Sequence, residues 1–160
     1  MYHMTPQYFA GVVGSRRRNT LHDRRIVNAL MDWLIHKHER LVLVSGGCQQ
    51  GADAFAEEAA DLCGILKLIF PIDKKGATSR WDFTRLAYER NKVVAQNSTA
   101  VYALVAEDRK GGTENTVEHA LKLQKPVYLI TNSGEVYLSE DGTLPKCEPV
   151  ARLLDSKYTD

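Results

Sequence analysis

Two glycine-rich loops, at residues 45–53 and 108–116, each join a short apolar run to an amphipathic helical pattern. Apolar runs of strand length recur along the chain and alternate with helical patterns. Such alternation is typical of βαβ units, whose right-handed crossovers build a parallel sheet. We therefore expect a Rossmann-like, three-layer α/β/α fold with about five parallel strands. The predicted strands cover residues 8–13, 41–44, 65–70, 100–106 and 127–130.

The intervening segments carry helix signals. Thr20 and Asp23 have the spacing of a capping box, and apolar positions recur after them at helical spacing. Weaker signals near the C-terminus predict a short edge strand at 135–138 and a helical turn at 149–154. We expect one domain over residues 1–160, with a core at 8–131 and an extension at 132–160. The other predicted helices cover residues 52–62, 81–96 and 116–123.

Composition excludes some classes of function. With 160 residues and 44% hydrophobic content, the chain can bury a core of its own. A net charge of +1 argues against a protein that coats DNA or a membrane surface. Three cysteines and five histidines lack metal-ligand spacing, so we expect reduced thiols and no metal site. Because no apolar leader or membrane span is present, we expect a cytoplasmic location and no membrane partner.

The first glycine loop lacks both the GxGxxG pattern of dinucleotide sites and the GK[ST] ending of a P-loop. Glycine backbone at a helix start can still cradle a phosphate, whereas a tight turn for helix packing is the structural alternative. Asp53 either stabilises the helix start or accepts a hydrogen bond from a sugar hydroxyl. The candidate residues of this loop are Ser45, Gly46, Gly47, Gly51 and Asp53.

The second glycine loop offers Gly111, Gly112 and two hydroxyls, of Thr113 and Thr116, near a helix start. Thr113 is also a candidate N-cap, a role that is compatible with ligand binding. We interpret the loop as a second anion-binding turn.

Gly14, Ser15 and Arg16 follow the first predicted strand directly. Arg16 is close enough to the strand end to grip a phosphate, whereas Arg17 and Arg18 are expected mainly on the solvated surface. The carboxyl ends of parallel strands meet at one edge of a sheet, where ligands bind. The two glycine loops and this turn therefore indicate a single pocket.

The order of these motifs, together with Arg90 and Asn91 on a predicted helix, resembles the SLOG superfamily over about residues 8–131. That group contains the Smf/DNA-processing protein A family and the Lonely Guy, or lysine-decarboxylase-like, phosphoribohydrolases. The resemblance implies a Rossmann-like nucleotide-binding domain without a cofactor, closer to the small stand-alone members, and plausible self-association.

The phosphoribohydrolases cleave the N-glycosidic bond of a nucleoside monophosphate and carry a PGGxGTxxE signature. Arg90 matches their catalytic arginine in position, but Thr116 occupies the position of their glutamate. Threonine cannot carry the charge that stabilises an oxocarbenium-like transition state. If the chain is an enzyme of this kind, Glu114 or Glu118 would have to replace that residue.

Our reading is that the chain binds a nucleotide or nucleotide-derived phosphorylated ligand at the edge of the sheet. Nucleoside-monophosphate hydrolysis is the alternative. A third possibility, single-stranded DNA binding, is not favoured, although Lys74, Lys75, Arg80 and Trp81 could extend a basic, aromatic surface.

Overall fold

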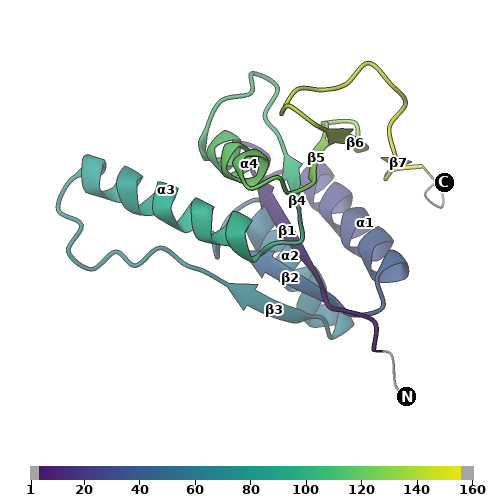
Figure 1. Ribbon diagram of the computed structural model, residues 1–160, viewed down its shortest axis with the longest axis horizontal. Coiled ribbons are helices and arrows are strands. Elements are labelled where there is room, and N and C mark those ends of the chain that lie inside the picture. Colours follow the sequence, from purple (N-terminus) through teal and green to yellow (C-terminus); the bar gives the residue numbers. More distant parts are fainter. Residues whose placement is uncertain (1–3, 156–160) are drawn as a thin grey trace.

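The computed structural model describes residues 4–155 (Figure 1). Residues 1–3 and 156–160, which the expected domain of 1–160 includes, lie outside the described part. The elements in chain order are β1 (Tyr8–Gly14), α1 (Leu21–Lys37), β2 (Leu41–Ser45), α2 (Ala52–Cys63), β3 (Leu66–Ile69), α3 (Arg80–Asn97), β4 (Ala100–Leu104), α4 (Gly112–Lys122), β5 (Val127–Ile130), β6 (Glu135–Ser139) and β7 (Ala151–Arg152).

These strands form one sheet in the order β3-β2-β1-β4-β5-β6-β7. The first five strands of that order run parallel, whereas β6 and β7 are antiparallel additions after β5. The expected α/β fold with five parallel strands is therefore confirmed, with two further strands. The chain moves outward from β1 to β3 and then returns to β4 on the other side of β1. This reversal creates a switch point between β1 and β4, at the carboxyl ends of the strands.

Helices cover both faces of the sheet. The packing of α1 and α2 forms one apolar core, which includes Val12, and the packing of α3 and α4 forms the other, which includes Val13. Neighbouring strand residues alternate between the two cores because side chains alternate across a strand. The first half of α3 extends past the sheet (Figure 1), and only Asn91, Val94 and Ala95 of this helix are buried.

Local sequence signals explain where the helices begin and end. The expected capping box at the start of α1 is confirmed, since the Thr20 hydroxyl accepts from the Asp23 N–H and the Asp23 carboxylate accepts from the Thr20 N–H. The end of α2 is also as the sequence indicates, because Gly64 adopts the left-handed conformation that terminates the helix.

Apart from shifts of one or two residues at the ends of elements, the structure differs from expectation in three places. The helical turn expected at 149–154 is wrong, because Ala151–Arg152 pairs with β6 as a short strand. The edge strand expected at 135–138 is found as β6, but β7 lies outside it. Helix α4 begins at Gly112 rather than near Thr116, so Thr113 lies within its first turn and Gly111 is the N-cap. Thr113 is therefore not the N-cap that the sequence suggested. The N-cap is Gly111, whose φ of 119° is a backbone conformation that residues with a side chain rarely adopt.

Within residues 4–155, no helix is both long and apolar enough to cross a bilayer. The same residues contain no group of three or more His, Cys, Asp or Glu side chains that could hold a metal ion.

Candidate functional site

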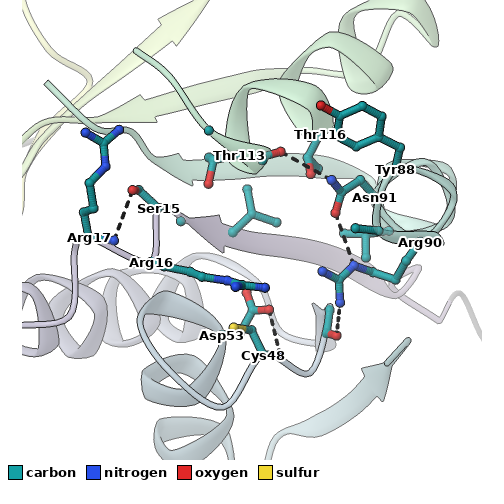
Figure 2. Close-up of a pocket in the computed structure, with 17 residues that line it drawn as sticks. Ser15, Arg16, Arg17, Cys48, Asp53, Tyr88, Arg90, Asn91, Thr113 and Thr116 are labelled. Carbon is teal, nitrogen blue, oxygen red and sulfur yellow. Dashed lines mark hydrogen bonds between the residues drawn. The ribbon is translucent and has the colours of Figure 1, made fainter. Parts of the chain in front are cut away.

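A cavity of about 340 Å³ lies at the switch point, where the loops after β1 and β2 meet α3 and the start of α4 (Figure 2). It brings together most of the residues that the sequence nominated, from four separate segments. The lining residues are Val13, Gly14, Ser15, Arg16, Arg17, Gly46, Cys48, Asp53, Ala87, Tyr88, Arg90, Asn91, Val94, Gly111, Gly112, Thr113 and Thr116.

One wall of the cavity is the start of α4. The first N–H groups of a helix have no intrahelical partner, and here they belong to residues at the cavity. The side chains of Thr113 and Thr116 line the cavity beside them and are largely buried, at 7% and 3% exposed. Neither hydroxyl has a hydrogen-bond partner within the described residues. This wall therefore presents several hydrogen-bond donors whose capacity the protein does not use.

The opposite wall is the first turn of α2, which carries Asp53. The side chain is buried, and one carboxylate oxygen accepts a hydrogen bond from the Cys48 N–H at 3.0 Å. Burial raises the pKa of Asp53 to about 6, although the positive charges of Arg90 and Arg16 oppose this rise. Desolvation favours the neutral form of a carboxyl, whereas nearby cations favour the charged form. The cavity therefore contains an acid that titrates near neutral pH.

On α3, Arg90 and Asn91 connect the two glycine loops. The Arg90 guanidinium donates to the Gly46 carbonyl, and its Nε donates to Asn91 Oδ1 at 3.2 Å. Asn91 Nδ2 in turn donates to the Gly112 carbonyl at 3.3 Å and to Asn115 at 3.2 Å. This chain of contacts (Figure 2) fixes the Arg90 side chain at the side of the cavity, so its charge is pre-organised.

The three consecutive arginines have three different surroundings. Arg16 is exposed, lines the cavity and forms no ion pair within residues 4–155. Arg17 also lines the cavity, but its guanidinium forms two hydrogen bonds to Asp108, at 2.7 and 2.8 Å. The expectation that Arg18 lies on the solvated surface is wrong, because its side chain is 4% exposed and its Nε is bound to Asp23 at 3.0 Å. Only Arg16 therefore combines access to the cavity with an uncommitted charge.

Three nominated residues of the first loop shape the turn without lining the cavity. The Ser45 hydroxyl donates to Glu57 at 2.7 Å and accepts from the Gly47 N–H at 3.2 Å. Gly51 precedes α2, and its N–H donates to Asn19 at 2.8 Å. These contacts hold the loop in a shape that brings Gly46 and Asp53 to the cavity.

Neither of the glutamates nominated for catalysis lines the cavity. The carboxylate of Glu114 is held by the Arg109 guanidinium at 2.7 and 2.8 Å, and Glu118 is exposed on α4. Sequence reasoning also missed Tyr88, which lines the cavity from α3 although the residue is half exposed. Its position three residues before Asn91 on the same helical face was the signal that could have identified it.

Residues 12–75 match the family described as YspA, cpYpsA-related SLOG. A search of curated proteins finds no match. Among solved structures, the molybdenum cofactor binding protein from the phototrophic bacterium Rippkaea orientalis is 26% identical, with a TM-score of 0.63 over 80% of this chain and 78% of that chain. The molybdenum cofactor carrier protein from Chlamydomonas reinhardtii is 19% identical, with a TM-score of 0.56 over 79% and 78% of the two chains, and it shows the shared fold alone. The predicted likeness to the SLOG superfamily is therefore confirmed.

Proposed function

We propose that the cavity binds a phosphorylated small molecule, and that a nucleotide or nucleotide-derived compound is its natural class of ligand. One observation carries this proposal: the uncommitted Arg16 guanidinium and the free hydroxyls of Thr113 and Thr116 face one cavity at a helix start. A phosphate accepts several hydrogen bonds at once and is favoured at a helix N-terminus. The cavity volume of about 340 Å³ suits a small ligand.

In this proposal the phosphate lies against the first turn of α4. The N–H groups there and the two threonine hydroxyls donate to its oxygens, and Arg16 neutralises its charge. Arg90 adds a second, fixed positive charge from the side of the cavity. The rest of the ligand extends toward α3, where Val94 and the ring of Tyr88 offer apolar contact.

Titration calorimetry with nucleoside monophosphates, cyclic nucleotides and ADP-ribose tests the proposal. Arg16→Ala should weaken binding tenfold or more, because a hydrogen bond to a charged group contributes about 1.5–3 kcal/mol. Arg85→Ala is the matched control, since it removes one exposed arginine of α3 outside this cavity. Thr113→Val and Thr116→Val remove each hydroxyl at nearly constant volume. No binding at millimolar concentration, or equal effects of Arg16→Ala and Arg85→Ala, would overturn the proposal.

The molybdenum cofactor is a second candidate ligand. It is favoured by the 26% identity and the shared fold with the protein from Rippkaea orientalis, which is described as binding that cofactor. The cofactor, like a nucleotide, joins a phosphate to a nitrogen heterocycle, so the same donors could serve either ligand. Elemental analysis for molybdenum and mass spectrometry of the compound that co-purifies with the protein distinguish the two. Molybdenum with a pterin would favour the cofactor, and a purine or pyrimidine phosphate would favour the nucleotide.

A further inference from the structure

The carboxylate of Asp53 has an oxygen that the protein does not use. Asp53 is 8% exposed, yet it lines the cavity from the first turn of α2. Its Oδ2 accepts from the Cys48 N–H, while Oδ1 has no hydrogen-bond partner within residues 4–155. Figure 2 shows the carboxylate at the opposite side of the cavity from Thr113 and Thr116.

In the described part of the chain, the charged side chains around Asp53 form no hydrogen bond or ion pair with its Oδ1. Arg16 and Arg90 are near enough to stabilise the carboxylate, and Glu57, one turn further along α2, repels it. Neither arginine is within ion-pair distance of Asp53, however, and the Arg90 guanidinium is already bound to Gly46 and Asn91. Because Asp53 lines the cavity, this oxygen is open to it, and a ligand that displaces solvent from the oxygen must supply a hydrogen-bond donor in its place.

Resting on the function proposed above, we propose that Asp53 is a specificity-determining residue that accepts a hydrogen bond from a hydroxyl or N–H group of the phosphorylated ligand. The ligand then has two distinct ends, with the phosphate toward α4 and a neutral hydrogen-bond donor toward α2. A site that uses a buried acceptor in this way discriminates strongly against ligands that lack the matching donor.

Two parts of a ligand could supply the donor, namely a sugar hydroxyl or a ring N–H of a base or pterin. Ribose 5-phosphate against 2-deoxyribose 5-phosphate tests the sugar hydroxyl alone. AMP against 2′,3′-dideoxy-AMP tests both hydroxyls in an intact nucleotide. GMP against IMP tests an N–H donor on the edge of the ring, because the two nucleotides differ only in the 2-amino group. In each pair the phosphate is unchanged, so a difference in affinity reports on the donor.

The decisive experiment measures these affinities by calorimetry at pH 7.5 for the wild type and for Asp53→Asn, which preserves the size of the side chain. The wild type should prefer the donor-bearing member of at least one pair by about tenfold or more. Asp53→Asn should reduce that preference to about onefold, because the single amide oxygen of asparagine accepts from the Cys48 N–H and its NH2 group faces the ligand. Inorganic phosphate should still compete, and no more weakly than with the wild type, because a negative charge has been removed from the cavity. Asp61→Asn, an exposed aspartate of the same helix, is the matched control and should retain the preference.

The pair of ligands between which the wild type discriminates and Asp53→Asn does not identifies the group that supplies the donor. A preference that persists in Asp53→Asn, or no preference in the wild type for any pair, overturns this inference and leaves phosphate binding intact. Failure of the wild type to bind every phosphorylated probe overturns the proposed function, and this inference with it. Thermal unfolding of Asp53→Asn verifies that the variant is folded.

Discussion

The guanidinium of Arg90 occupies the space in which a side chain at Gly46 would stand. A Cβ at position 46 would lie 2.8 Å from Arg90 Nη1 and 2.9 Å from its Cζ. The absence of a side chain at Gly46 therefore leaves room for the Arg90 guanidinium to reach the first loop from α3. Gly46 is required for this space and not for an unusual backbone conformation.

Gly46→Ala should displace Arg90 without unfolding the protein, because the atoms that clash belong to the end of a flexible side chain. We expect weaker binding of phosphorylated ligands, by about tenfold, through loss of a pre-organised charge. Calorimetry on Gly46→Ala, Arg90→Ala and the double variant measures this. The double variant should bind no more weakly than Arg90→Ala. Additive losses would contradict the assigned role of Gly46.

Arg18 should be essential for stability rather than for binding. It donates to Asp23 Oδ1 at 3.0 Å and to the carbonyl oxygens of Ile130 at 2.7 Å and Thr131 at 3.1 Å, and so joins α1 to the end of β5. Arg18→Met leaves Asp23 as an uncompensated buried charge, so the free energy of unfolding should fall by about 3–5 kcal/mol. Chemical denaturation measures the loss. Arg17→Ala, whose partner Asp108 is exposed, should hardly change the midpoint, and equal effects of the two variants would contradict the prediction.

These arginines also show the limit of prediction from sequence. The alternation of apolar runs and helical patterns was sufficient for the parallel sheet, because strand and helix periods are local signals. The position of the glycine loops at the strand ends then indicated where the pocket should lie. Which arginine of three consecutive ones is buried depends on Ile130 and Thr131, more than 100 residues away, and no local pattern carries that information.

Non-local packing also explains why the sequence did not predict the positions of Tyr88 and Glu118 relative to the cavity. The rotation of α3 and α4 about their axes is set by how the two helices pack against the sheet and each other. That packing turns Tyr88 toward the cavity and leaves Glu118 exposed. The Arg109–Glu114 pair likewise depends on a loop whose Arg109 has a positive φ of 54°, which the sequence did not indicate.

We expect the protein to bind nucleoside monophosphates without cleaving them. Among the described residues, Asp53 is the only carboxyl that lines the cavity. Thr116 lines it too, at the position where the resemblance to the phosphoribohydrolases predicts a glutamate. Chromatography of AMP and GMP incubated with the protein measures release of free base. Release by the wild type that Glu114→Gln or Glu118→Gln abolishes would contradict this expectation and would restore a catalytic role to that glutamate.

Asp53→Asn should stabilise the unliganded protein, and the gain should depend on pH. The pKa of Asp53 is about 6 in the folded protein, above its ordinary value of 3.8, because burial disfavours the charged carboxylate. The folded state therefore binds the proton more tightly than the unfolded state. The stability that follows from this is fully present below about pH 3.8 and is lost as the pH rises through 6.

Asparagine does not ionise, so the free energy of unfolding of Asp53→Asn does not fall for this reason as the pH rises. The difference in the free energy of unfolding between Asp53→Asn and the wild type should be near zero around pH 4. It should grow to about 3 kcal/mol above pH 7, since one pKa unit corresponds to about 1.4 kcal/mol. Urea denaturation of both proteins between pH 4 and pH 8 measures the difference, in which contributions from other groups cancel. A difference that stays constant with pH would mean that burial does not raise the pKa of Asp53 in the folded protein. A difference that grows as expected would mean that the wild type retains a destabilising carboxylate in its cavity, as a residue kept for ligand recognition does.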